Sequence, residues 1–182
     1  MINDVFTETR EKMNKVITHC SNEISVIRTG RASTSMLDSI KVDYYGTMSP
    51  LNNIANITIP EAQLISIQPF DPSSLELIEK AISESDLGLT PNNDGNVIRL
   101  NIPALTQDRR KELVKQVHKI IEDGRIAIRN IRRDANEQLK KLEKSHDLSE
   151  DNLKRSLDNI QEITDTYIGT LNQIQDSKEK EI

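Results

Sequence analysis

Apolar side chains recur at alternating spacings of three and four residues in three stretches of the chain. These stretches cover residues 2–27, 114–142 and 153–174. Such spacing places the apolar residues along one side of an α-helix, where they form a continuous stripe. A helix with one apolar stripe is stable in water only when the stripe packs against a partner. The pattern therefore predicts three long helices that pack together as an elongated bundle.

The second and third predicted helices are joined by only a few residues, 145–148. A connection this short forces two helices to run antiparallel. Ser149 is placed to cap the third helix, and Leu148 and Leu153 have the spacing of a hydrophobic staple. We therefore expect an antiparallel helical hairpin on which the N-terminal helix packs.

Between Arg31 and Ile102 the pattern changes to the two-residue alternation of β-strands. The expected strands cover residues 40–44, 54–59, 64–68 and 97–102. A helix is expected at 72–85, and Asn92 to Gly95 is expected to form a turn before the last strand. The fold class is therefore α+β: a three-helix bundle with an inserted small β/α/β domain.

The predicted boundaries assign residues 1–29 and 106–182 to the bundle and 31–104 to the inserted domain. The chain crosses between the two parts at Thr29-Gly30-Arg31 and again at Pro103-Ala104-Leu105. Two short connections that contain glycine and proline predict a hinge that bends about a defined axis.

Charge is distributed unevenly along the chain. The net charge is -5, which by itself argues against a nucleic-acid partner. Residues 107–144, however, carry twelve Lys or Arg against seven Asp or Glu, whereas 145–182 carry four against nine. The middle segment 30–106 is also four against nine. Positive charge is therefore concentrated on the second predicted helix.

Four arginines of that helix, Arg125, Arg129, Arg132 and Arg133, flank its apolar stripe. At about 100° per residue, the first three lie within roughly 60° of one another. We call these four residues the arginine ladder. Guanidinium groups suit bidentate phosphate contacts, so the ladder favours binding to structured RNA. The alternative is a solvated face that pairs with Asp134, with Glu122 or with the acidic third helix.

No set of residues in the sequence has the spacing of a catalytic or metal site. The three histidines lack metal-ligand spacing with each other or with Cys20, and Asp71 is better placed to cap a turn. We therefore expect no enzyme activity, no metal and no cofactor. Cys20 is the single cysteine and lies in the apolar stripe of the first predicted helix, so we expect a buried thiol in a reducing cytoplasm. The N-terminus has no apolar leader and no stretch could cross a membrane, which makes export an unfavoured expectation.

Seven motifs along essentially the whole chain resemble the ribosome recycling factor family in order and spacing. They are Arg28-Thr29-Gly30-Arg31-Ala32, Val42-Asp43-Tyr44-Tyr45-Gly46, Pro69-Phe70-Asp71, Ser85-Asp86-Leu87-Gly88-Leu89, Asp94-Gly95-Asn96-Val97-Ile98-Arg99-Leu100, Arg109-Arg110-Lys111-Glu112-Leu113 and Ile128-Arg129-Asn130-Ile131-Arg132-Arg133-Asp134-Ala135-Asn136. Thr34, where the family commonly has proline, and Gly124, where it has a better helix former, depart from the pattern.

The resemblance implies an L-shaped, monomeric factor of protein biosynthesis that acts after translation termination. Such a factor binds the post-termination ribosome at large-subunit rRNA of the intersubunit bridge. With elongation factor G and GTP hydrolysis it promotes dissociation into subunits and release from mRNA. By motif match, Arg132 and Arg129 would be the principal rRNA contacts, supported by Arg133, Arg110 and Arg28. The inserted domain would face elongation factor G.

Two other function classes remain open from the residues alone. In the first, all three apolar stripes belong to a coiled-coil adaptor for protein partners, and the arginines only keep it in solution. In the second, the inserted domain is an enzyme, which would require measurable turnover. Binding to RNA, unlike an adaptor contact, should weaken steeply as salt rises.

Overall fold

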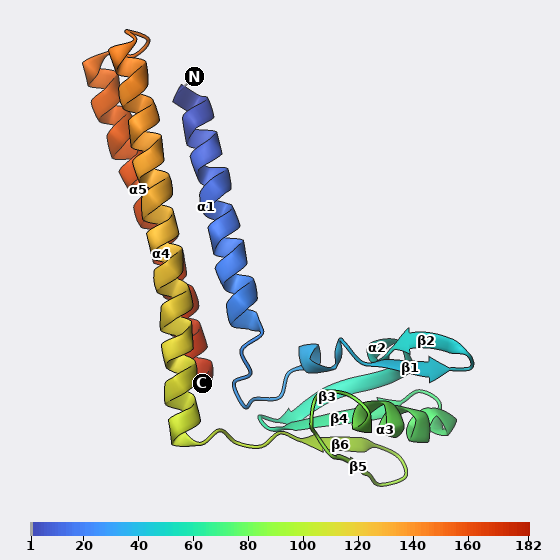
Figure 1. Cartoon of the computed structure of the whole chain (residues 1–182). Helices are drawn as coiled ribbons and strands as arrows, with labels where there is room; N and C mark the ends of the chain where they lie inside the picture. Colours follow the sequence, from blue (N-terminus) through green and yellow to red (C-terminus); the bar gives the residue numbers. More distant parts are fainter. Residues whose placement is uncertain (1) are drawn as a thin grey trace. The chain divides into compact units, whose positions relative to one another are not determined.

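A computed structural model of the chain describes residues 2–182 and divides into two compact units. The helical unit contains the chain up to Thr29 together with Gln107–Ile182, and the inserted unit contains Gly30–Thr106. Both units are drawn in Figure 1.

The helical unit is built from α1 (Ile2–Ser25), α4 (Gln107–Lys144) and α5 (Glu150–Glu181). The three helices pack pairwise along their lengths, as Figure 1 shows for this unit. The predicted stripes are the buried faces of these helices, and α4 and α5 extend beyond their stripes at both ends, where polar residues carry no periodic signal. The first helix ends at Ser25 rather than at the expected Ile27, whose N–H closes a turn on the carbonyl of Ile24.

Two clusters of buried side chains form the core of the helical unit. The first contains Met13, Cys20, Ile24, Val117, Ile121, Ile128 and Leu171, and the second contains Val5, Ala135, Leu139, Leu148 and Ile160. The two buried threonines, Thr9 and Thr164, donate their hydroxyl hydrogens to the carbonyls of Val5 and Ile160. These hydroxyls are therefore satisfied within their own helices and do not disturb the apolar core.

The connection between α4 and α5 confirms the predicted cap. Ser149 Oγ accepts a hydrogen bond from the backbone N–H of Asn152 at 3.3 Å, and Leu148 is buried against Leu153. The cap satisfies an N–H group that has no partner inside the helix, and the apolar contact fixes how the chain enters α5.

The inserted unit contains a hairpin and a four-stranded antiparallel sheet. The hairpin is β1 (Lys41–Tyr44) and β2 (Thr47–Pro50), and the sheet has the order β3 (Ala55–Glu61), β4 (Leu64–Pro69), β6 (Ile98–Asn101) and β5 (Pro91–Asn93). Its helical segments are η1 (Thr34–Leu37), α2 (Leu51–Ile54), η2 (Pro72–Ser74) and α3 (Leu75–Ser83). Leu75, Ile78 and Ile82 of α3 are buried in one core with both sheets. The predicted α+β class is confirmed.

Three details of the predicted inserted domain differ in the structure. Asn92 and Asn93 lie in β5 rather than in a turn, because they pair with Arg99 and Ile98 of β6. Residue 54 ends α2 instead of starting a strand. The expected helix at 72–85 begins as the short η2, since Asp71 caps that turn by accepting the N–H of Ser73 at 3.0 Å.

Acid should selectively weaken the turn between β5 and β6. Asp94 Oδ1 accepts the backbone N–H groups of Asn96 at 3.0 Å and Val97 at 2.8 Å, and Arg99 forms an ion pair with the same carboxylate. These bonds, the Asn96 bond first, lower the pKa of Asp94 from 3.8 to about 2. A folded-state pKa below the unfolded value gives stability that is present above pH 3.8 and lost as the pH falls toward 2.

The Asp94→Asn variant tests this linkage, because the amide oxygen can still accept N–H groups but carries no charge. We expect the melting temperature of the variant to lie below that of the parent at pH 5, and the difference to shrink as the pH falls from 4 to 2. Thermal unfolding followed by circular dichroism at several pH values measures it. A difference that stays constant over this range would show that the charge of Asp94 does not contribute.

Candidate nucleic-acid interface

All four ladder arginines lie on α4, but their side chains have different surroundings. Arg125 and Arg132 are partly buried beside α5, whereas Arg129 and Arg133 are exposed. The four arginines therefore share one helix but differ in how far they are open to solvent. The α4 backbone that carries them is a continuous helix of 38 residues, about 57 Å long at 1.5 Å per residue.

Arg125 is committed to contacts within the protein. Its Nη2 donates to Asn172 Oδ1 at 2.6 Å and to Gln175 Oε1 at 3.2 Å, and its Nη1 donates to Glu122 Oε2 at 3.0 Å. Its side chain is only 22% exposed. Arg125 therefore mainly joins α4 to α5, and it has fewer hydrogen-bond donors available for an external ligand than the neighbouring arginines have.

Arg132 has a neutral partner on α5. Its Nη1 donates to Gln161 Oε1 at 3.1 Å, and Gln161 Nε2 in turn donates to Asp165 Oδ1 at 2.8 Å. One guanidinium nitrogen is thus engaged by an amide oxygen, which adds no negative charge. The remaining donors of the fork leave Arg132 able to bind a phosphate group.

Arg129 pairs with a carboxylate, as the alternative interpretation of the ladder expected. Its Nη1 donates to Glu122 Oε1 at 3.3 Å, and Glu122 also accepts from Arg125. The hydrogen bond from Arg125, followed by attraction to both arginines, lowers the pKa of Glu122. The Arg129 side chain is 46% exposed, so this ion pair is a weak one that an approaching phosphate can exchange.

Asp134, the other acid considered for the ladder, lies on the side of α4 that faces α1. The pKa of Lys12 on α1 is raised first by its hydrogen bond with Glu8, and Asp134 adds a smaller attraction.

Arg133 and Arg110 are exposed and make no side-chain hydrogen bond or ion pair with any of residues 2–182. Their guanidinium groups are therefore available to an external anion.

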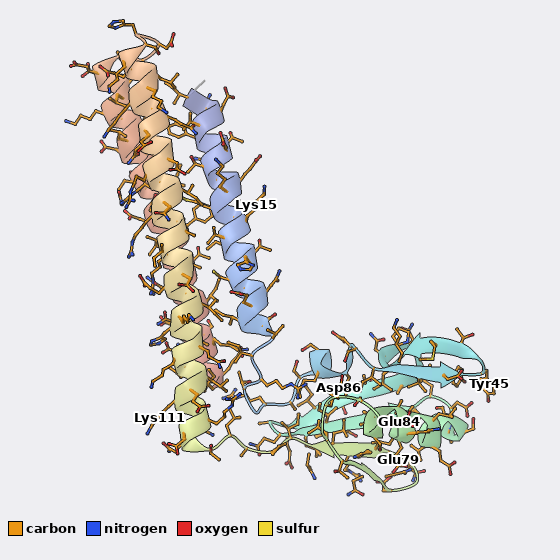
Figure 2. The ribbon with its side chains drawn as sticks, in the orientation of Figure 1. Lys15, Tyr45, Glu79, Glu84, Asp86 and Lys111 are labelled. Carbon is orange, nitrogen blue, oxygen red and sulfur yellow. The ribbon has the colours of Figure 1, made fainter. Side chains whose placement is uncertain are left out.

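The other predicted contact residues do not cluster with the ladder. Arg110 lies in the first turns of α4 next to Lys111, which Figure 2 labels, and roughly 30 Å along the helix from Arg129 and Arg132. Arg28 is exposed and follows the C-terminal end of α1. The structure thus places the five predicted RNA-binding residues in one group of three on α4 and two separate positions.

The residues that directly adjoin the two predicted hinge segments, Ala32 and Ile102, are anchored to one turn of the inserted unit. The N–H of Ala32 donates to the carbonyl of Ala62, and the N–H of Ile102 donates to the carbonyl of Gln63, both at 2.8 Å. Gly30 has φ +71, and a Cβ added there would meet Leu105 Cγ at 2.8 Å. Of the other hinge residues, Thr29 is partly buried and Arg31, Pro103 and Ala104 are exposed.

Several carboxylates of the inserted unit lie on α3, beside it, or in the turn that precedes it. Figure 2 shows Glu79 and Glu84 on and beside α3, with Asp86 just beyond. Asp71 accepts from the hydroxyls of Tyr44 and Tyr45 as well as from Ser73, whose backbone bond is the largest cause of its lowered pKa. The carboxylate therefore has the capping role expected of it.

Within residues 2–182, no group of three or more His, Cys, Asp or Glu side chains could hold a metal ion. In the same range no helix is both long enough and apolar enough to cross a membrane.

Cys20 is buried, and this burial, more than the nearby Glu23 and Asp123, raises the pKa of its thiol. The expectation of a buried thiol is confirmed.

Sequence reasoning missed the amide side chains of α5 that contact the ladder, which are Gln161, Asn172 and Gln175. Glutamine and asparagine are common on helix surfaces and carry no pattern that marks a site. The only signal available was their shared face on the third helix, and its orientation toward α4 depends on how the two helices are aligned.

Known proteins resemble this chain over its full length. A family model described as "Ribosome recycling factor" matches residues 20–182. The ribosome-recycling factor of Bacillus subtilis is 50% identical over 182 residues, covering 100% of this chain and 98% of that protein. The ribosome-recycling factor of Lawsonia intracellularis is 55% identical over 178 residues, covering 98% of this chain and 95% of that protein.

Solved structures agree with the sequence comparisons. The solution structure of a ribosome recycling factor matches with a TM-score of 0.76 and 44% identity, covering 99% of this chain and 96% of that one. A second match, with a TM-score of 0.66 and 46% identity, covers 100% of this chain and 98% of the other. It comes from models for the T. thermophilus ribosome recycling factor and the E. coli elongation factor G bound to the E. coli post-termination complex. By family model, relatives and structures alike, the chain belongs to the ribosome recycling factor family.

Proposed function

We propose that this protein is a ribosome recycling factor. It binds the bacterial ribosome after termination and, with elongation factor G and GTP hydrolysis, promotes dissociation into subunits and release from mRNA. Family membership over residues 20–182 is the observation that carries the proposal. The T. thermophilus relative studied together with elongation factor G on a post-termination complex supports the choice of partners. The protein acts in the cytoplasm as a monomer and without catalytic chemistry of its own.

The arginine ladder supplies the contact with large-subunit rRNA at the intersubunit bridge. Arg132 and Arg129 are the principal contacts, with Arg133, Arg110 and Arg28 in support. The physical support is that Arg132 keeps its charge beside a neutral amide and that Arg133 and Arg110 have no partner among residues 2–182. Phosphate contacts of this kind release counterions, so binding should be steeply salt-dependent.

The long helices allow a movement of the bundle to act on the rRNA to which the arginines are bound. The apolar stripes of α1, α4 and α5 are buried in two clusters along the bundle, so the three helices move together as one closely packed body. The inserted unit faces elongation factor G, and the hinge at 29–31 and 103–105 lets its movement be passed to the bundle. Moving the bundle against a bridge to which it is bound would break that bridge.

A light-scattering assay tests the proposed function directly. Post-termination ribosomes are mixed with this protein, a matched elongation factor G and GTP. Scattering should fall as ribosomes separate into subunits, and it should stay constant when GTP or the protein is left out. Constant scattering in the complete mixture would contradict the proposal.

The variant Gly30→Val tests the hinge. The backbone at position 30 has a φ of +71, which is unfavourable for valine, and the valine side chain would clash with Leu105. We expect the variant to slow subunit splitting more than it weakens ribosome binding. The clash should also destabilise the inserted unit by about 1–3 kcal/mol. Splitting is followed by light scattering and binding by co-sedimentation with ribosomes.

Gly88→Val is the matched control for the hinge. Gly88 has a similar φ of +65, but a Cβ there meets nothing within 4 Å. This control carries the backbone strain without the contact to Leu105, and it lies outside both hinge segments. Equal losses of splitting and binding in Gly30→Val would show that Gly30 serves folding and not movement.

A further inference from the structure

The α5 side of the arginine ladder presents amides, although α5 is rich in carboxylates. Arg132 contacts Gln161, and Arg125 contacts Asn172 and Gln175. The same helix carries acidic residues at 158, 162, 165 and 176. Among residues 2–182, no carboxylate of α5 forms an ion pair with a ladder arginine. The hydrogen-bond acceptors that α5 offers to these arginines are therefore neutral amides, although the helix also carries carboxylates.

An amide oxygen and a carboxylate act differently on an arginine. Both accept a hydrogen bond and hold the long side chain in one conformation, which limits the entropy lost when a ligand binds. Only the carboxylate neutralises the guanidinium charge, and an approaching RNA phosphate would then have to displace it. An amide partner thus orients an arginine for phosphate binding without competing for its charge.

Gln161 is itself held in the orientation that this role needs. Its Nε2 donates to Asp165 Oδ1 at 2.8 Å, one helical turn further along α5. The amide oxygen is therefore left to face Arg132 Nη1 at 3.1 Å. A chain of two hydrogen bonds connects the Asp165 carboxylate to the guanidinium group, and the neutral amide lies between the two charges.

We propose that Gln161 is a positioning residue for RNA binding: it fixes Arg132 against α5 in a conformation open to an RNA phosphate and leaves the arginine charge uncompensated. The inference rests on the proposed function, because it specifies how the same arginine meets rRNA. It adds a neutral residue of the acidic helix α5 to an interface otherwise made of arginines.

Gln161→Glu tests the proposal, since it keeps the acceptor and adds the charge. We expect affinity for bacterial ribosomes to fall about tenfold, and the slope of log affinity against log salt to become shallower by about one. Position 161 is exposed, so thermal stability should change little. Affinity is measured by co-sedimentation with purified 50S subunits between 50 and about 300 mM salt, a range in which phosphate contacts are resolved.

Asn159→Asp is the matched control. It adds the same charge to α5 two residues away, at about 200° around the helix from position 161 and thus facing away from the ladder. We expect its affinity and salt slope to stay close to those of the parent. If Gln161→Glu and Asn159→Asp bind alike, net charge alone explains the effect and the positioning role of Gln161 is wrong.

Gln161→Met separates orientation from charge. Methionine has a similar length but no strong acceptor, so Arg132 loses its partner and keeps its charge. Affinity should fall by a smaller factor, about two- to fivefold, with the salt slope unchanged. A parent-like affinity in this variant would also overturn the proposal. If the parent protein does not bind 50S subunits at all, the proposed function itself fails, which is a different result from a parent that binds and variants that match it.

Discussion

Replacing Arg129 and Arg132 together with alanine is expected to weaken binding to bacterial ribosomes on the order of 100-fold at moderate salt. Each arginine can supply a charge-assisted hydrogen bond to phosphate, worth about 1.5–3 kcal/mol, and 1.4 kcal/mol corresponds to a factor of ten. The salt slope should become shallower by about two, one for each lost contact. Co-sedimentation with 50S subunits at a series of salt concentrations measures both quantities.

The control for this double variant removes two charges from α4 outside the ladder, in Lys119→Ala with Lys141→Ala. Both lysines are exposed, and each lies at least nine residues, about 14 Å, along the helix from Arg129 and Arg132. The control should bind within a few-fold of the parent. Equal binding by the ladder variant and the parent would favour the coiled-coil adaptor, in which the arginines serve only solubility.

The helical unit could be predicted from the sequence because its information is local. A stripe such as the one through Met13, Cys20 and Ile24 reports the buried face of its own helix, whatever partner covers it. Capping signals such as Ser149 are equally local. Helix ends are harder to predict than the presence of a helix. Gln107 lies before the first apolar residue of its stripe and Glu181 lies after the last apolar residue of its own, so no periodic signal marks either end.

The missed elements of the inserted unit depend on distant partners. β5 is three residues long and exists because Pro91, Asn92 and Asn93 pair with β6. Asn93 Nδ2 donates to Glu79 of α3 at 2.9 Å, and Asn93 Oδ1 accepts the N–H of Gly95 at 2.8 Å, so this residue belongs both to β5 and to the turn that follows it. β2 lacks the alternation of a half-buried strand, and it follows a turn in which Tyr45 and Gly46 both have positive φ. Neither pairing can be read from local spacing.

The candidate site shows the same division. The arginines could be placed on one side of a helix from spacing alone, and their guanidinium chemistry suggests phosphate. Which arginine is free and which is tied to α5 depends on the alignment of two helices, as the contrast between Arg125 and Arg133 shows. The partner amides at positions 161 and 172 become meaningful only once that alignment is known.

Gly124→Val is expected to destabilise the helical unit by about 3 kcal/mol. Gly124 lies in the buried stripe of α4, where a Cβ would approach Cys20 Sγ to 2.7 Å and Leu171 Cδ1 to 3.3 Å. All three helices meet at this point, so a larger side chain forces them apart, and overpacking of a core costs typically 1–3 kcal/mol. The small gain in helix propensity from replacing glycine does not offset this. Urea unfolding followed by the helical circular dichroism signal measures the loss.

Gly169→Val provides the matched control, and Cys20 provides a rescue. Gly169 also lies within a helix, but a Cβ there meets nothing within 4 Å, so the same substitution should leave stability unchanged or raise it by a few tenths of a kcal/mol. Combining Gly124→Ala with Cys20→Ala removes the sulfur that the new Cβ would meet. The double variant should therefore be more stable than the sum of the two single losses predicts. Strict additivity would show that the helices shift freely around position 124, and that close approach there does not require glycine.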